Sequence, residues 1–380
     1  MSTRKLLAAT VMAGLFAAPA LASDLTIGLT ISATGPAAAL GQPQRNTVPL
    51  LPETIDGLKV NYIVYDDATD PTNASRNANR LVEEGRVDVL VGSSTVSNTL
   101  AVTEVAVEKR VPLVALAPVS PPGDKGHWVF SMPQNNLLMA GAIAEDMVAN
   151  GVKSVAVIGF ADPYGESFLA AMTTVAEQHG LSIAITEKFN RADTSVLGQA
   201  LRLVSARPDA VLIVASGTPA ALPHATLVER GFKGRIYQTH GAIGRDVLRV
   251  GGAAIEGGIF VSGPIIIGDQ LAADHPSRQA IIEYVRRYEE MHGAGSMGPQ
   301  GGHLWDAVAV IAAAVPAARE KAQPGTPEFR VALRDAIEQV QGVVGVHGVF
   351  NMSAEDHFGH DERARVLVRV ENGAYRLVTN

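Results

Sequence analysis

From Asp24 onward, short runs rich in valine, isoleucine and leucine alternate with longer segments whose apolar residues recur at helical spacing. A short, continuously apolar run is typical of a strand that is buried on both faces. The alternation therefore predicts an α/β protein, in which helices cover both faces of a parallel sheet. We predict strands at residues 25–31, 59–66, 87–91, 112–116, 154–159, 181–188, 210–215, 235–238 and 258–261.

The alternation falls into two stretches, one ending near Met132 and one running from about Asn136 to Phe260. Each stretch is long enough for a domain, so we expect two domains. The remaining sequence predicts helices at residues 277–292, 303–321 and 327–341. Two apolar runs around Glu371-Asn372-Gly373 predict a final β-hairpin.

One predicted helix is well marked at its start, where Asp70 precedes Pro71. Aspartate is a favoured N-cap residue, and proline is favoured at the first helical position. Asp66, Asp67 and Asp70 are also spaced closely enough to suggest a metal site. A calcium loop needs further oxygen ligands and a closing glutamate, which this segment lacks, so we favour the cap and expect no metal.

The first 22 residues, MSTRKLLAATVMAGLFAAPALA, have the form of a secretory signal peptide. Arg4 and Lys5 precede an apolar core that is too short to span ~30 Å of hydrocarbon, and Ala20 and Ala22 suit cleavage before Ser23. A short membrane anchor is the alternative. No cysteine follows the apolar run, so we expect a freely diffusing periplasmic protein rather than a lipoprotein.

The composition excludes several classes of function. The chain has no cysteine, so it has neither disulfides nor thiolate chemistry, and burial must stabilise it. A formal charge of −7 without a polybasic block argues against nucleic acid as a partner. We find no phosphate-binding glycine loop, no HExxH and no GxSxG, so we expect neither a cofactor nor an enzyme.

Small polar residues follow the predicted strands repeatedly. In open α/β sheets, ligands bind outside the carboxyl ends of the strands, and helices that begin there offer free N–H groups to anions. These loops can also be mere caps and turns, but their number favours a shared cleft. The five polar loops lie at residues 93–97, 117–120, 161–165, 216–218 and 239–241.

In order and spacing, six segments resemble the type I periplasmic solute-binding proteins of ABC transporters, in the branch of the leucine/isoleucine/valine-binding proteins. The segments are IGLTISATGPAAALGQPQ, YDDATDP, VDVLVGSSTVSNTLAV, VPLVALAP, IGFADPYGESF and GGHLWDAVAV. The resemblance implies two Rossmann-like lobes that are joined by three hinge crossings, near Pro133, Gly263 and Val346. Lobe one would hold residues 24–132 and 264–346, and lobe two residues 133–263 and 347–380.

The resemblance also implies roles for individual residues. Ligand carboxylates in this family are held by the loops after the third and fourth strands, which here contain Ser93, Ser94, Thr95 and Val96, and Ala117, Pro118 and Ser120. The tyrosine that lies over the ligand matches Tyr164.

Three positions depart from the amino-acid binders. His240 replaces an acidic residue that holds the ligand ammonium, Thr218 replaces a tyrosine, and Leu40 replaces an aromatic residue. Without a carboxylate partner, burial of the ligand ammonium would cost several kcal/mol of binding free energy. Asp162 is the alternative partner. His240 can instead donate to a ligand carboxylate or hydroxyl, or it can cap a helix without touching the ligand.

Pro49 and Pro52 also depart from the family's long first helix, so we predict that this helix is short or kinked. Arg45, near its start, could pair with an anionic ligand, although a surface arginine is the simpler interpretation.

We therefore expect a monomeric periplasmic component that captures a small carboxylated solute between its lobes and delivers it to a membrane ABC permease. By resemblance the ligand is a branched-chain or related amino acid. The alternative is an aromatic or aliphatic carboxylate without an ammonium. Two other classes stay open: a sensor module that presents ligand to a membrane receptor, and a secreted enzyme on the same fold.

Overall fold

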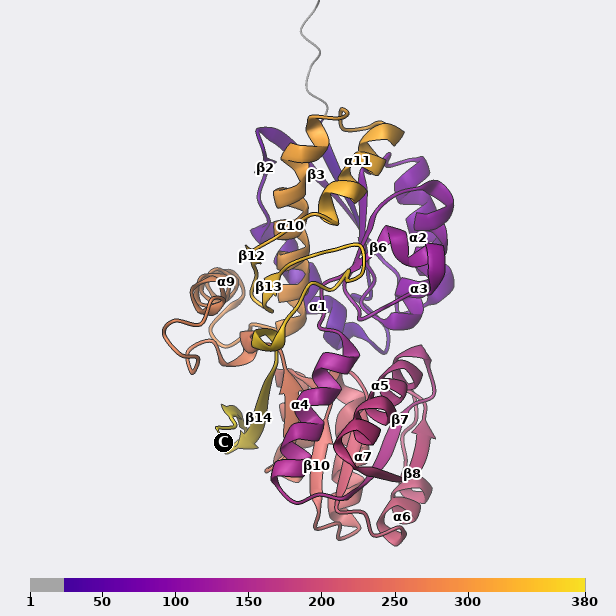
Figure 1. Cartoon of the computed structure of the whole chain (residues 1–380), viewed down its shortest axis with the longest axis vertical. Helices are drawn as coiled ribbons and strands as arrows, with labels where there is room; N and C mark the ends of the chain where they lie inside the picture. The colour runs from indigo at the N-terminus through magenta and orange to yellow at the C-terminus, as the bar shows by residue number, and fades with distance from the viewer. Residues whose placement is uncertain (1–23, 380) are drawn as a thin grey trace, which may run out of the picture.

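The computed structural model describes residues 24–379, and the predicted signal peptide lies outside the described residues. The chain forms two α/β lobes that lie end to end (Figure 1). Each lobe contains a largely parallel sheet with helices on both faces, as the sequence predicts.

The lobe-one sheet has the strand order β2-β3-β1-β4-β5-β6, and only β2 runs antiparallel to its neighbour. All four residues of β4 are buried, as are Leu25, Ile27, Leu29 and Ile31 of β1, which explains the continuously apolar strand sequences. The strands are β1 (Leu25–Ile31), β2 (Thr54–Ile55), β3 (Leu58–Asp66), β4 (Val89–Gly92), β5 (Leu113–Ala115) and β6 (Val129–Ser131).

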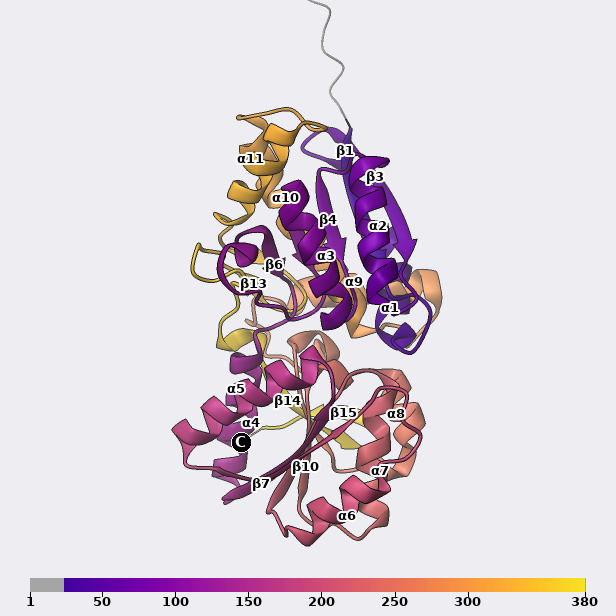
Figure 2. The ribbon, with the colours of Figure 1, turned by 90° about the vertical axis from the view of Figure 1, so that its right-hand side faces the viewer.

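Helices α2 and α3 cover one face of this sheet, and α10 and α11 cover the other (Figure 2). Helices α1 and α9 lie at the end of the lobe that faces lobe two. The helices are α1 (Ala38–Thr47), α2 (Pro71–Glu83), α3 (Val96–Lys109), α9 (Arg278–His292), α10 (Pro299–Arg319) and α11 (Pro327–Ile337).

The lobe-two sheet has the order β15-β14-β11-β10-β9-β7-β8, with the antiparallel hairpin β14–β15 at one edge. Helices α4 and α5 cover one face, and α6, α7 and α8 cover the other (Figure 2). The strands are β7 (Ser154–Phe160), β8 (Ser182–Phe189), β9 (Ala210–Val214), β10 (Arg235–Gln238), β11 (Ile259–Ser262), β14 (Val366–Glu371) and β15 (Ala374–Leu377). The helices are α4 (Asn136–Ala149), α5 (Pro163–His179), α6 (Leu197–Ser205), α7 (Ala221–Glu229) and α8 (Arg245–Gly251).

All nine predicted strands are present, with ends that differ by at most two residues. The hairpin is also confirmed, with Asn372 and Gly373 at φ of 53° and 70° in its turn. The sequence missed β2, β6, β12 (Val343–Val344) and β13 (Val349–Phe350). Each of these has only two or three residues, too few to show a hydrophobic period.

The first helix is short, as predicted: α1 ends at Thr47, and a single 3-10 turn at Val48–Leu50 contains Pro49. Arg45 is exposed on α1, which agrees with a surface role. Asp70 caps α2, because its carboxylate accepts from the Asn73 backbone N–H at 2.8 Å. The cap interpretation of this aspartate is therefore confirmed.

Helix α10 is long and apolar enough to cross a membrane, but two thirds of its most apolar window is buried inside the protein. It packs along α1 and α11 and contributes Leu304, Val308 and Ile311 to the lobe-one core. Its hydrophobicity is therefore that of a core helix.

The chain crosses between the lobes near Pro133, after β6, and near Gly263, after β11. The third crossing lies later than the predicted Val346. Phe350 and Met352 are part of the lobe-one core, and the Ser131 N–H donates to the His357 carbonyl at 2.9 Å. The chain enters lobe two only at β14, because residues 349–358 complete the lobe-one wall beside β6.

Candidate functional site

The two sheets bring corresponding loops together. In lobe one, β1 lies between β3 and β4, and in lobe two β7 lies between β8 and β9, so the connections leave in opposite directions at these points. Ligands of open α/β sheets bind at such switch points. A cavity lies there between the lobes, and residues from both lobes line it. They are Leu40, Gln44, Ser94, Thr95, Val96, Leu116, Ala117, Pro118, Pro133, Gln300 and His303 from lobe one and the hinge, and Tyr164, Arg191, Ser216, His240 and Gly241 from lobe two.

The cavity is narrow with the lobes in this arrangement. It holds about 470 Å³ of unoccupied space, of which about 50 Å³ is wide enough for the centre of a water molecule. Ligand sites for small molecules commonly enclose about 300–1,000 Å³, far more than the 50 Å³ that is accessible here. Entry of a solute therefore requires the lobes to separate, which fits a site that is built from two hinged halves.

Eight of the predicted binding residues line this cavity: Leu40, Ser94, Thr95, Val96, Ala117, Pro118, Tyr164 and His240. They belong to four predicted loops and to α1. These loops therefore converge on one cavity.

Four predicted binding residues lie outside the cavity wall. Ser93 donates its hydroxyl to Asp67 at 2.6 Å, and Asp162 caps α5 by accepting from the Gly165 N–H at 3.0 Å. Thr218 begins a 3-10 turn after β9, and Ser120 is exposed in a groove on lobe one. In the arrangement described, none of these four residues lines the cavity.

A hydrogen bond to Asp67 makes the Ser93 hydroxyl unavailable to a ligand. This fully buried carboxylate accepts hydrogen bonds from the hydroxyls of Ser32 and Ser93 at 2.7 and 2.6 Å, and from Asn98 Nδ2 at 2.8 Å. Charge-assisted hydrogen bonds of this length are the strong ones. Asp67 thus fixes the start of α3, where Ser94, Thr95 and Val96 enter the cavity wall.

Arg191, which follows β8, is the charged residue of the cavity wall. Its guanidinium donates to the carbonyl and the hydroxyl of Ser216, each at 3.1 Å, and lies 3.6 Å from an Asp162 oxygen. It also stacks over Phe160, with Cζ 4.3 Å from the ring centroid. Burial lowers the pKa of Arg191, and Asp162 opposes that shift. A partly satisfied, buried cation of this kind is suited to a carboxylate.

Two imidazoles complete the wall on the side of the hinge. His240 and His303 are each only 9% exposed. Burial lowers the pKa of His240 to about 3 and also lowers that of His303 well below its usual range, so both rings are neutral near pH 7. His303 stacks on His347, with ring centroids 3.9 Å apart. These rings offer hydrogen bonds but no charge.

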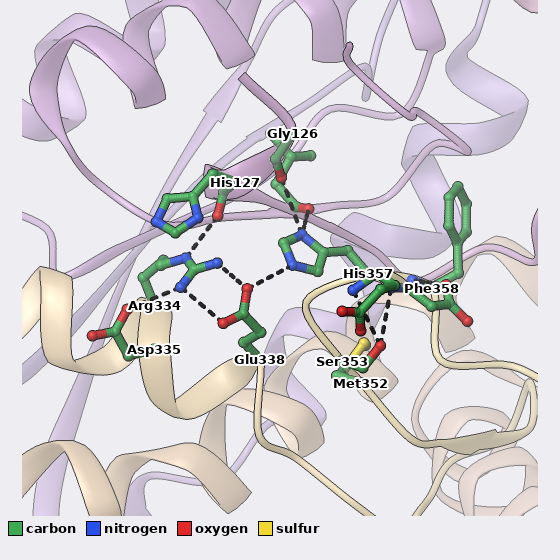
Figure 3. Close-up of polar contacts among 12 residues, drawn as sticks. Gly126, His127, Arg334, Asp335, Glu338, Met352, Ser353, His357 and Phe358 are labelled. Atoms are coloured by element: carbon green, nitrogen blue, oxygen red, sulfur yellow. Dashed lines mark hydrogen bonds and ion pairs between the residues drawn. The ribbon is translucent and has the colours of Figure 1, made fainter. Parts of the chain in front are cut away.

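A larger groove, with about 1420 Å³ of unoccupied space, lies on lobe one between residues 119–129 and 354–358. Figure 3 shows the polar residues at its base. Arg334 donates to the His127 carbonyl at 2.7 Å and pairs with Glu338, and the His357 ring bridges Glu338 and the Val129 carbonyl at 3.1 and 2.9 Å. These groups satisfy one another, so this base braces α11 against β6.

Comparison with known proteins identifies the fold. A family model described as periplasmic binding protein matches residues 24–374. The chain belongs to the periplasmic binding protein family. This family assignment agrees with the resemblance that the sequence segments carry.

The curated relatives of this periplasmic binding protein are distant. A leucine-, isoleucine-, valine-, threonine- and alanine-binding protein of Pseudomonas aeruginosa is 29% identical over 50% of this chain and 53% of its own length. A Leu/Ile/Val-binding protein of Rhizobium johnstonii is 27% identical over 55% and 59%. The matched part of the chain thus spans between half and three fifths of the length of these two relatives.

Solved structures match over the whole fold. An extracellular ligand-binding receptor from Rhodopseudomonas palustris is 42% identical, with a TM-score of 0.91 over 94% of this chain and 99% of its own. A leucine-binding protein from Thermotoga maritima has a TM-score of 0.81 at 20% identity, over 93% and 98%. The second likeness concerns the fold alone.

Sequence reasoning missed several wall residues of this periplasmic binding protein, above all Arg191, Gln44 and His303. Arg191 carried the same signal as the predicted loops, because the polar segment 190–195 directly follows a predicted strand. Gln44 and His303 lie inside two segments that carry the family resemblance. No pattern within their own helices marks these two side chains as wall residues.

Proposed function

We propose that this periplasmic binding protein captures a small monocarboxylate that lacks an ammonium group. The observation that carries the proposal is the charge of the cavity wall: among the described lining residues, Arg191 is the one charged side chain, and no carboxylate lines the cavity. A buried anion gains from the cation, whereas a buried ammonium has no counter-charge there.

The ligand carboxylate binds the Arg191 guanidinium together with the N–H groups at the start of α3. Two guanidinium donors already serve Ser216 and Asp162 lies 3.6 Å away, which leaves part of the five-donor guanidinium for a ligand. The apolar groups of Leu40, Leu116 and Pro118 cover the rest of the ligand. Among proteins of this fold, one from Rhodopseudomonas palustris was solved with benzoate, so the architecture can enclose an aromatic acid.

Closure follows from the distribution of these groups. Arg191 and His240 belong to lobe two, whereas Gln44, Ser94 and Thr95 belong to lobe one. A ligand contacts both sets only when the lobes are closed, and this difference in binding energy shifts the equilibrium towards closure. We propose that the closed, monomeric protein then delivers its ligand to a membrane ABC permease in the cell envelope, without chemical conversion.

An amino acid is the second candidate, and one contact favours it. Asp162 lies 3.6 Å from Arg191, close to the cavity, and could hold an ammonium if its side chain turned. The names of the curated relatives point the same way. Against it, Asp162 already caps α5 and pairs with Arg191.

Matched ligand pairs that differ only in the amino group test the proposal. Calorimetry compares leucine with 4-methylpentanoate, and phenylalanine with 3-phenylpropanoate, with benzoate as an additional acid. We expect the desamino acid of at least one pair to bind at least tenfold more tightly than its amino acid. Tighter binding of the amino acid in both pairs, or failure of every acid to bind, would overturn the proposal.

A further inference from the structure

Three side chains of the cavity wall carry buried nitrogen atoms without a hydrogen-bond partner. They are Gln44, through Nε2, and His240 and His303, through both ring nitrogens. Gln44 is 1% exposed and the two histidines 9%. A buried polar atom without a partner costs about 1–3 kcal/mol, and the large majority of buried side-chain polar atoms in proteins are paired. Five of them around one cavity need a common explanation.

Other polar groups of the same wall are satisfied by the protein. Tyr164 donates its hydroxyl to Thr239 at 2.8 Å, Thr95 accepts from the Asn98 N–H, and Gln300 Nε2 donates to the Ile243 carbonyl at 2.8 Å. The unpaired nitrogens therefore mark particular positions of the wall and are not a general property of it. These positions are where a ligand supplies the missing partners.

The chemistry of these nitrogens restricts the partner. Gln44 Nε2 can only donate, whereas a neutral imidazole has one N–H and one lone pair. Burial keeps both rings neutral by lowering their pKa values. An imidazole lone pair requires a donor and an imidazole N–H requires an acceptor. A single hydroxyl donates one hydrogen bond and accepts up to two, so it can pair with the lone pair of one ring and the N–H of the other. A hydroxyl group satisfies both requirements.

The imidazoles and the cation occupy different parts of the cavity. His240 follows β10, whereas Arg191 follows β8, and β9 and β7 lie between these strands in the sheet. His303 stacks on His347, whose ring lies beside the crossing at Gly263. The imidazoles therefore extend from β10 and α10 on the hinge side, whereas the cation extends from β8 and reaches Ser216 after β9.

We propose that His240 and His303, assisted by Gln44, form a subsite for a neutral hydroxyl group that is distinct from the group that binds the ligand carboxylate. This inference rests on the proposed function, because it assumes that Arg191 holds the carboxylate. It narrows the substrate class to hydroxylated monocarboxylic acids. The two imidazoles come from opposite lobes, so the hydroxyl also bridges the closed state.

Pairs of acids that differ by one hydroxyl test the subsite at several lengths. The pairs are benzoate and 4-hydroxybenzoate, 3-phenylpropanoate and 3-(4-hydroxyphenyl)propanoate, and hexanoate and 6-hydroxyhexanoate. Calorimetry gives the affinity ratio within each pair, and 4-methoxybenzoate reports whether an acceptor alone suffices. We expect the hydroxyl to raise affinity at least tenfold in one pair or more, and the methoxy compound to lack that gain.

Variants then assign the gain to the imidazoles. In His303→Leu and in His240→Leu, the affinity ratio between the hydroxylated and the unhydroxylated acid should fall to less than threefold. His303→Gln, which retains a donor and an acceptor, should restore part of the gain. The matched control is His360→Leu, since His360 is also buried with both nitrogens unpaired but packs on Phe350 outside the cavity wall. That variant should keep the full gain.

The outcomes separate the two proposals. If the acids bind but no pair shows more than a twofold effect of the hydroxyl, the subsite is refuted and the proposed function stands. The subsite is also refuted if both imidazole variants retain the gain while thermal melting shows them folded. If no acid of either kind binds, the proposed function fails and the subsite fails with it.

Discussion

Replacement of Arg191 by glutamine removes the cation on which the proposed function depends. The guanidinium side chain is 14% exposed and has five N–H donors. Two of these serve Ser216, and Asp162 lies 3.6 Å away. Glutamine keeps a polar end but is neutral and shorter. The substitution therefore tests how much the positive charge of Arg191 contributes to ligand binding.

The expected loss follows from these contacts. Truncating one partner of a buried, hydrogen-bonded charge pair costs about 2–5 kcal/mol. Asp162 already neutralises part of the arginine charge, so we take the lower part of this range, about 2–3 kcal/mol, which is about 30- to 150-fold in Kd. Removing the arginine also leaves Asp162 facing the incoming carboxylate, and Arg191→Gln combined with Asp162→Asn should recover part of the loss.

The assay is titration calorimetry with the acid that binds most tightly in the matched-pair screen. Arg202→Gln is the control, because Arg202 is a surface arginine that pairs with Glu187 and is far more exposed, at 57%. Circular dichroism confirms that each variant is folded. A loss of less than threefold in a folded Arg191→Gln protein, or an equal loss in the control, would refute the assignment of the carboxylate to Arg191.

Three further substitutions or conditions have defined outcomes. Asp67→Ala should lower the unfolding free energy by more than about 3 kcal/mol in urea titrations, because it leaves several buried donors unpaired; a loss under 1 kcal/mol would contradict its organising role. Gly165→Ala would place a Cβ 1.9 Å from the Phe160 carbonyl oxygen, so we expect a lower melting temperature and weaker ligand binding, whereas unchanged values would show that α5 can shift freely. Acid should destabilise the protein as the pH falls below about 6.5. Burial lowers the pKa of His347 to about 4, so the ring binds a proton in this pH range only when the protein unfolds. The unfolding free energy should fall by about 1.4 kcal/mol per pH unit for each such histidine. The buried Asp306, whose pKa is raised to about 7, acts in the opposite direction, since its stabilising effect is lost as the pH rises from about 4 to 7; melting temperatures that stay level from pH 7 to 4.5 would contradict the greater weight given to the histidines.

The sequence predicted the loops of the candidate site better than it predicted the side chains that act there. Ser94, Thr95 and His240 lie in the cavity wall, whereas Ser93, in the same segment as Ser94, turns away because Asp67 holds its hydroxyl. Sequence position places a residue near a strand end, but competition among neighbouring polar groups decides which side chains remain free. In the sequence, Asp67 is only one of three closely spaced aspartates at the end of a predicted strand, so that competition was not visible.

The last hinge crossing shows the same limit for the domain boundaries. Val346 marks the end of the predicted lobe-one segment, yet Phe350 and Met352 still pack in the lobe-one core. Short strands such as β13 have no period to detect, and their side chains are assigned to a lobe only by what they contact.

The sequence by itself determined the local structure of this protein: strands that are apolar throughout because both faces are buried, helices that begin at capped residues such as Asp70, and polar loops after the strands. Only the tertiary structure decided which loops face one another, and so brought Arg191, Gln44 and His303 together around one cavity. The physical reason is that hydrophobic periodicity and capping act over a few neighbouring residues, whereas a binding site depends on contacts between segments that are hundreds of residues apart. Such contacts form only when the two lobes have folded and met.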